Sequence, residues 1–343
     1  ITDLKIFDIK YIILKLGGNI MVFDGHSDIL TDVAIKRLNG EKNVFRNHHL
    51  ERLKKGEVNG SIFVVWVDPP YTDENPAWRM LEILGALSEE IKDMKDYAEI
   101  AHNYEDMKRI QDQGKFAIIL GIEGMSGLRG NTSLITMLYE FGIRHGMLTW
   151  NEENEFATGS NGNPERGITQ LGIKALHKME ELGMIIDVSH GNEKTFWDIC
   201  NHTRKPFIAS HSNVYNLCQS KRNLKDDQIK AIAERNGVIG MNSWPDFIDK
   251  KNPTVERLAD HIDYIVNLVG IDYVGFGFDF CDFLSGDTTN SFQESETTMA
   301  KGIEDASKIP QLIKILSDRG YGQEQIEKIT HKNFERVIKE ILK

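Results

Sequence analysis

The segment MIIDVSHGNEKTFWDICNHTRKPFIASH, residues 184–211, has the pattern of a strand, a helix and a second strand. Its two short apolar runs, 184–188 and 206–209, flank a stretch that is long enough for a crossover helix. Two strands joined in this way lie parallel in one sheet. His190 and His211 each follow one of these strands, so the pattern predicts both side chains at the same edge of a parallel sheet.

The same alternation extends over the chain and predicts an α/β fold, a (β/α)8 TIM barrel. Gly142, Gly183, Gly237 and Gly270 each follow a helical segment and are expected as C-terminal caps. The alternative is a doubly wound open sheet, which usually has a Gly-rich phosphate turn after its first strand; residues 24–28 (DGHSD) lack one. The predicted strands are residues 21–24, 60–67, 116–122, 143–149, 184–188, 206–209, 238–242 and 273–278, and the predicted helices are 76–94, 132–141, 167–182, 193–202, 226–236 and 255–269.

Length and composition favour one domain. The chain has 343 residues, of which 40% are hydrophobic, and no linker or repeat divides it. We therefore expect a single domain over residues 21–343. Residues 15–18 (KLGG) lie shortly before Met21 and correspond to what a translated ribosome-binding site would encode. One interpretation is that residues 1–20 are a non-native segment; the other is that they are a genuine leading segment.

Charge and cysteine usage exclude several roles. The net charge of −11 disfavours binding to nucleic acid or to an anionic membrane surface. No apolar run has the length of a membrane span or of a signal peptide. Cys200, Cys218 and Cys281 form no metal-binding or disulfide pattern, which suits a reducing compartment, so a cytoplasmic location is expected.

Ionisable side chains gather where the predicted strands end, which in an α/β barrel is the rim that carries the active site. Imidazole and carboxylate ligands suit Zn²⁺ first, with Mn²⁺, Co²⁺ and Fe²⁺ as competitors. Five ligands exceed what one tetrahedral ion takes, so they indicate two ions that share a carboxylate. The candidate metal ligands are His26, Asp28, Glu123, His190 and His211, and Asp279 follows the last strand.

Other polar residues near this rim have structural interpretations. Asp187 is expected to orient a neighbouring ligand or loop, and His145, inside a strand, is expected to be structural. The loops 69–75 and 243–251 are expected to border the site, with aromatic walls from Trp66, Trp244 and Phe247. The remaining histidines are expected at the surface or in packing: His48, His49, His102, His177, His202, His261 and His331.

The chain resembles the membrane (renal) dipeptidases and their bacterial relatives, over residues 24–342. Residues 24–28 are similar to the DGHND motif of that family, with Ser27 in place of Asn, and residues 121–124 (GIEG) to its GxEG motif. The other matching segments, in the family's order, are DVSH at 187–190, SHS at 210–212, Arg222-Asn223, GFGFDF at 275–280 and GIED at 302–305.

The resemblance implies a zinc-dependent dipeptidase on a barrel of the metal-dependent, amidohydrolase-like type. His26 and Asp28 would bind one zinc ion, and Glu123 would bridge it to the second. His190 and His211 would bind that second ion. A metal-bridging hydroxide would attack the amide, with Asp279 carrying its proton to the leaving nitrogen and Arg222 holding the terminal carboxylate of a small dipeptide, in some cases one with a C-terminal D-residue. The resemblance also suggests a homodimer.

One position departs from the family pattern. After the fourth predicted strand the family commonly has Leu-Thr-His, whereas this chain has Leu148-Thr149-Trp150-Asn151. Trp150 offers one N–H donor and cannot carry a proton, so we expect Trp150 or Asn151 to supply a weaker substrate contact. Two other functions remain open: another binuclear metal hydrolase acting on N-acyl amino acids, lactams or lactones, and a catalytically impaired protein that holds metal.

Overall fold

The computed structural model describes residues 20–289, 292–293, 297 and 299–343. The interpretations of residues 1–20 therefore fall almost wholly outside the described residues. In the described parts of the chain no helix combines the length and the apolar character that crossing a bilayer requires.

The strands form one parallel sheet that closes into a barrel, as the sequence predicts. Its order is β6-β5-β4-β2-β1-β8-β7. Isolated bridges Asp187–Ile208 and Ala209–Ile239 join its two ends. The predicted strand at residues 206–209 is thus present only as these two bridges. The strands are β1 (Val22–Ser27), β2 (Val58–Trp66), β3 (Ala98–Ile100), β4 (Phe116–Glu123), β5 (Ile143–Met147), β6 (Ile185–Asp187), β7 (Ile239–Met241) and β8 (Val274–Phe276).

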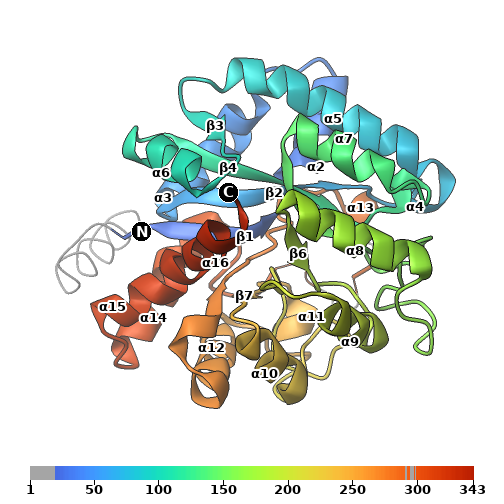
Figure 1. The fold of residues 1–343 in the computed structure, drawn as a ribbon. Helices are drawn as coiled ribbons and strands as arrows, with labels where there is room; N and C mark the ends of the chain where they lie inside the picture. The colour runs from blue at the N-terminus through green and yellow to red at the C-terminus, as the bar shows by residue number, and fades with distance from the viewer. Residues whose placement is uncertain (1–19, 290–291, 294–296, 298) are drawn as a thin grey trace.

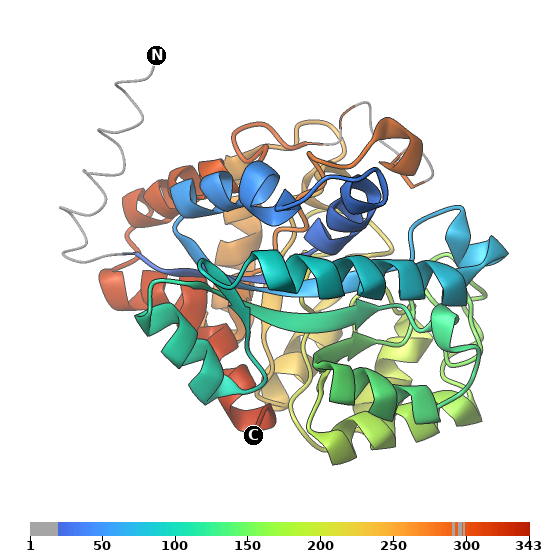
Figure 2. The ribbon, with the colours of Figure 1, turned by 90° about the horizontal axis from the view of Figure 1, so that it is seen from above.

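Helices cover the outside of the curved sheet (Figures 1 and 2). Those predicted from apolar periodicity are confirmed within a few residues: α5 (Pro76–Asp93), α7 (Ser133–Phe141), α8 (Gln170–Leu182), α9 (Glu193–His202), α10 (Asp226–Glu234) and α12 (Val255–Val269). The others are α2 (Ile29–Leu38), α3 (Glu51–Lys55), α4 (Tyr71–Glu74), α6 (Tyr104–Asp112), α11 (Pro245–Ile248), α13 (Gly286–Thr289), α14 (Ile309–Asp318), α15 (Gln323–Glu327) and α16 (Asn333–Ile341), with short 3-10 or π turns between some of them.

The predicted glycine caps are confirmed at three of four positions. Gly142, Gly183 and Gly270 have positive φ angles and follow helices, a conformation that glycine adopts at little cost. Gly237 has no positive φ angle. Asn236 before it takes the left-handed conformation instead, with φ 58°. A Cβ on Gly237 would lie 2.1 Å from the carbonyl oxygen of Phe207. This glycine therefore serves close packing against the 206–209 segment and is not a cap.

The barrel interior is closed at the end where the strands begin. Phe23 and Ile62, on adjacent strands, are fully buried in one cluster with Phe334 and Val337 of α16. The ring of Phe334 lies where a side chain on Gly25 would be. In Figure 1, α16 lies beside α6 at this end. The interior is therefore filled by side chains, and the polar site can form only at the opposite rim.

Candidate active site

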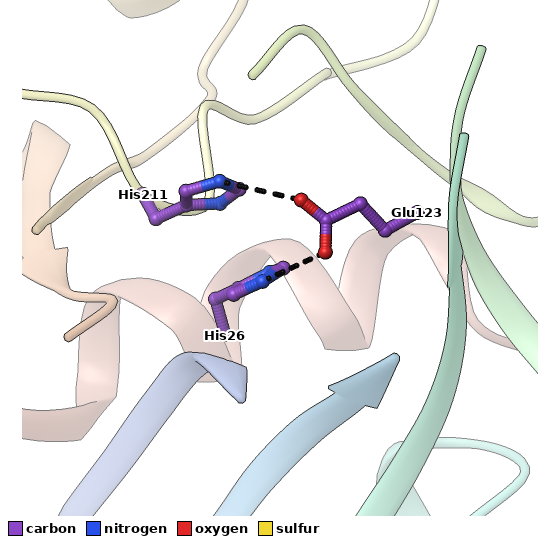
Figure 3. A group of neighbouring side chains, drawn as sticks. All are labelled: His26, Glu123 and His211. Atoms are coloured by element: carbon purple, nitrogen blue, oxygen red, sulfur yellow. Dashed lines mark ion pairs between the residues drawn. The ribbon is translucent and has the colours of Figure 1, made fainter. Parts of the chain in front are cut away.

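Two strands and the bridged segment 208–209 bring His26, Glu123 and His211 together, as the sequence predicts. His26 lies on β1, Glu123 ends β4, and His211 follows the bridged residues 208–209. His26 Nε2 is 3.2 Å from Glu123 Oε2, and His211 Nε2 is 3.8 Å from Glu123 Oε1. Figure 3 shows both imidazoles directed at the one carboxylate. One ligand atom from each of the three side chains lies within 4.8 Å of the others.

The other predicted ligands join this group from both sides. Asp28 Oδ2 and Asp279 Oδ1 lie 3.6 Å and 3.9 Å from His26 Nε2. His190 Nε2 lies 2.7 Å from Glu123 Oε1 and 2.8 Å from His211 Nε2. Glu123 thus faces His26 with one oxygen and the other two imidazoles with the other. The structure brings all six predicted residues into one cluster.

The electrostatics of this cluster fit a cation. Burial and the neighbouring Glu123 raise the pKa of Asp28 to about 6, and burial raises that of Asp279 to about 8. Burial holds the pKa values of His190 and His211 well below the usual range, so both imidazoles are neutral and can act as ligands. In this cluster the buried atoms His26 Nδ1 and Asp28 Oδ1 have no hydrogen-bond partner among the described residues. Crowded carboxylates with unpartnered oxygens and neutral imidazoles are what divalent metal ions stabilise.

Two neighbouring side chains orient the imidazoles. His190 Nδ1 lies 2.8 Å from Asn151 Oδ1, which also accepts a hydrogen bond from Ser160 Oγ at 2.7 Å. His211 Nδ1 lies 2.7 Å from Ser210 Oγ. Because an amide oxygen can only accept, His190 carries its proton on Nδ1 and turns the lone pair of Nε2 toward the centre. Asn151 lines the cavity, but its oxygen is engaged, so only its amide NH₂ is left for a substrate.

Asp187 makes the contacts expected of an orienting residue. Its Oδ1 accepts hydrogen bonds from the backbone N–H groups of Ser189 and Ser210, at 2.9 Å and 3.1 Å. Its Oδ2 lies 2.8 Å from Nε2 of the buried His145. Although burial raises the pKa of Asp187, these hydrogen bonds lower it to about 2. One carboxylate therefore fixes both loops that carry the later histidines.

The backbone around two site residues is constrained. His190 and Asp279 have φ angles of 68° and 57°, a region that non-glycine residues rarely occupy. A Cβ on Gly277 would lie 1.6 Å from the carbonyl oxygen of Ser210. The glycine thus lets the chain that carries His211 approach β8. Asn242 Nδ2 donates to Asp279 Oδ2 at 3.0 Å and holds the carboxylate toward the cluster.

A cavity of about 310 Å³ opens above the cluster, and we call it the catalytic cavity. Asp28, Glu123, His190 and Asp279 line its floor. Its aromatic wall is formed by Trp66, Trp150, Trp244, Phe247 and Phe292, and its cationic side by Lys221, Arg222 and Lys250. The three predicted aromatic walls are therefore confirmed as lining residues. The loop 243–251 borders the cavity, but residues 69–75 do not line it, because their turn forms α4 against α5.

Arg222 is held at the edge of this cavity. The residue Arg222 is only 8% exposed, and burial lowers the pKa of its guanidinium to about 10. One of its terminal nitrogens donates to the carbonyl oxygen of His211 at 3.3 Å, and the ring of Phe247 lies 5.4 Å away. Its buried Nε has no partner among the described residues. The arrangement leaves a donor free for an anionic group.

Sequence reasoning missed three contributors to the site. Asn242 directly follows β7, so the rule that strand ends carry function would have found it. Ser160 and Phe292 lie in loops without a local signal. Phe292 packs on Trp66, Trp150 and Trp244 at ring-centroid distances of 5.9, 5.7 and 5.3 Å.

A barrel with buried histidines and carboxylates at its carboxyl-terminal rim defines the class of metal-dependent α/β-barrel hydrolases. Within that class, residues 13–343 match the family model of membrane dipeptidase, peptidase family M19. The chain belongs to this family of metallopeptidases.

Curated relatives agree with the family. An uncharacterised dipeptidase of Schizosaccharomyces pombe is 35% identical over 237 residues, which are 67% of this chain and 54% of the relative. The chain thus spans about half the length of that relative. The dipeptidase aclJ of Aspergillus oryzae is 29% identical over 84% of this chain and 69% of its own length.

Solved structures show the same fold. A metallopeptidase from Rhodobacter sphaeroides, liganded with a phosphinate mimic of the dipeptide L-Ala-D-Ala, has a TM-score of 0.83 and 23% identity, covering 94% of this chain and 99% of its own. The probable dipeptidase PvdM from Pseudomonas aeruginosa has a TM-score of 0.81 and 21% identity, covering 99% of each chain.

Proposed function

We propose that this protein hydrolyses the amide bond of dipeptides with two zinc ions held by His26, Asp28, Glu123, His190 and His211. The observation that carries the proposal is the buried cluster in which these side chains meet, with Glu123 between two groups of ligands. The Oε2 atom of Glu123 faces His26, on the side of Asp28, and its Oε1 atom faces His190 and His211. This division supports Glu123 as the carboxylate that two metal ions would share when bound.

The metal ions, when bound, would activate water and polarise the scissile carbonyl. The protein supplies the proton transfer. Asp279 lines the catalytic cavity beside the cluster, and Asn242 fixes its orientation. We assign to Asp279 the removal of the proton from the attacking water and its delivery to the leaving nitrogen. A general acid–base of this kind contributes ~10²–10⁴ in rate.

Arg222 would hold the C-terminal carboxylate of the substrate. A guanidinium matches a carboxylate in geometry and charge, and the buried Nε of Arg222 is without a partner among the described residues. The aromatic wall closes the other side of the cavity. If Arg222 holds the C-terminal carboxylate and the scissile amide lies at the cluster, there is little room for more than one residue beyond that amide. This supports the limit to dipeptides. Trp150 and the Asn151 amide would contact the substrate next to His190.

Two other functions compete with this proposal. Another binuclear metal hydrolase could use the same cluster on an N-acyl amino acid, a lactam or a lactone. A catalytically impaired protein could hold metal without turnover. Trp150 suggests this alternative, because it stands where the family commonly has His. The presence of Asp279 in the cluster favours an enzyme, and Arg222 at the cavity edge favours a substrate with a free carboxylate.

Metal analysis combined with a peptide panel separates these functions. The panel contains L-L dipeptides, dipeptides with a C-terminal D-residue and N-acylated amino acids. The proposal predicts two zinc ions per chain and cleavage of dipeptides, and the D-residue series determines whether a C-terminal D-residue is accepted. Two metals with cleavage of only the N-acylated compounds would favour the other hydrolase. Two metals without any cleavage would favour the binding protein.

We further propose a cytoplasmic location and a homodimer. The three cysteines are all unpaired thiols, which supports a reducing compartment. Sedimentation of the purified protein tests the dimer, which rests on the family alone.

A further inference from the structure

A second cavity of about 310 Å³ lies behind Arg222. It opens at the carboxyl-terminal rim between the first turns of α9 and α10. Its lining includes Asn192 and Glu193 at the start of α9 and Lys225 and Gln228 at the start of α10. We call it the side cavity.

The side cavity and the catalytic cavity share one partition. Ser160, Ser220, Lys221 and Arg222 line both cavities. A carboxylate bound by Arg222 therefore lies at the boundary between them. The atom that carries this carboxylate also carries the side chain of the C-terminal residue, so that side chain starts at the same boundary.

The side cavity has a buried apolar wall, and polar residues, among them Lys221 and Arg222, line the rest of it. Val188, Phe196 and Leu224 are buried side chains that line it. Ser212 also lines it and is 1% exposed, and its hydroxyl oxygen has no hydrogen-bond partner among the described residues. An unpartnered buried hydroxyl costs free energy unless a ligand or water meets it. The buried apolar wall therefore suits an uncharged side chain of medium size.

The two residues of a dipeptide would meet different surroundings. None of the aromatic residues Trp66, Trp150, Trp244 and Phe292 lines the side cavity. They line the catalytic cavity, where the N-terminal residue would lie. At the outer edge of the side cavity, Lys225 Nζ pairs with Glu193 Oε2 at 2.7 Å.

We propose that the side cavity is the specificity pocket for the side chain of the C-terminal residue, and that it selects apolar side chains of the size of leucine or phenylalanine. This inference rests on the proposed dipeptidase function. Discrimination by an apolar pocket amounts to about 10–200-fold per methylene-sized difference.

Substitutions at Leu224 test the pocket, because this side chain lines only the side cavity. The substrates are Ala-Gly, Ala-Ala, Ala-Leu and Ala-Phe, and the readout is the ratio of kcat/KM for each to that for Ala-Gly. Leu224→Trp fills the pocket and should lower the Ala-Leu and Ala-Phe ratios by about 10-fold or more. Leu224→Ala enlarges it and should raise the Ala-Phe ratio over the Ala-Leu ratio. In the same way, product inhibition by free leucine should weaken in Leu224→Trp.

The control is Leu38→Trp, the same change at a 60% exposed position on α2, which should leave all ratios as in the wild type. If both Leu224 variants keep the wild-type ratios, or slow all four substrates equally, the inference is wrong while the dipeptidase function stands. If the wild type cleaves none of the dipeptides, both fall.

Discussion

Asp279 is fixed by its backbone and by its neighbours. Its φ of 57° and the hydrogen bond from Asn242 direct the carboxylate toward the cluster, 3.9 Å from His26 Nε2. Because it is assigned to proton transfer, Asp279→Asn should lower kcat by ~10²–10⁴ while the protein keeps its metal. Steady-state kinetics with metal analysis of the same sample measure this. Asp112→Asn on the exposed face of α6 is the matched control. Full activity of the Asp279 variant would remove the assignment.

Asn151 has a testable role toward His190. If the amide oxygen of Asn151 is removed, the N–H at His190 Nδ1 loses its hydrogen-bond acceptor, and the imidazole ring loses the contact that orients it. Asn151→Ala should therefore weaken metal binding by about 10–100-fold. Competition with a chromogenic chelator measures this affinity, with Asn47→Ala at an exposed site as control. An unchanged metal affinity with an altered KM would instead show that Asn151 contacts the substrate and does not orient His190.

At the scale of single residues, the sequence predicts which residues belong to the site better than it predicts which side chains those residues contact. The candidate metal ligands could be predicted because each lies at or just after the end of a predicted strand, and the rim of a barrel brings strand ends together. The hydrogen bond from His190 to Asn151 could not, because it depends on the exact path of the loop after β5. Phe292 has no signal at all, since its position over the three tryptophans is decided by packing between distant segments.

At the scale of elements, the approach of β8 to the His211 loop depends on Gly277. A methyl group there would overlap the carbonyl oxygen of Ser210, at 1.6 Å. Gly277→Ala should cost about 3 kcal/mol of unfolding free energy and weaken metal binding, because the loop that carries His211 must move.

Gly85 in α5 provides the matched control for this change. A Cβ on Gly85 meets no atom within 4 Å, so Gly85→Ala should stabilise the protein by about 1 kcal/mol through helix propensity. Denaturant unfolding of both variants measures the difference. Equal effects of the two substitutions would contradict the close approach.

The elements themselves follow local rules to different degrees. The long amphipathic helices were predictable because one face of each repeats its apolar residues at helical spacing. The short strands were less so. Residues 206–209 make only two bridges, and β3 pairs with β4 outside the barrel path, because backbone pairing over a few residues is set by neighbours and carries no period in the sequence.

For the whole molecule, the stability should depend on the protonation of His261. Its Nδ1 accepts a hydrogen bond from the backbone N–H of Val214 at 3.0 Å, and its Nε2 donates to the carbonyl oxygen of Ile248 at 2.9 Å. Burial lowers its pKa from 6.5 to about 4. Only the neutral ring fits these partners, so its contribution is complete above pH 6.5 and is lost as the pH falls from 6.5 toward 4, by on the order of 3 kcal/mol.

The comparison with His261→Gln isolates this contribution. The metal-free wild type should be more stable than the metal-free variant at pH 7.5, and the difference should shrink as the pH falls toward 4. Urea unfolding at several pH values measures it, and metal-free protein separates the effect from the loss of metal. A difference that stays constant with pH would show that His261 does not titrate in this range.

The most direct measurement is a zinc titration of the metal-free protein, followed by hydrolysis of a dipeptide at each step. The buried group formed by His26, Asp28, Glu123, His190 and His211 predicts no activity without metal and a rise that reaches its plateau at two equivalents per chain. Hydrolysis by the metal-free protein, or metal uptake that ends below two equivalents while activity is already complete, would contradict the binuclear centre.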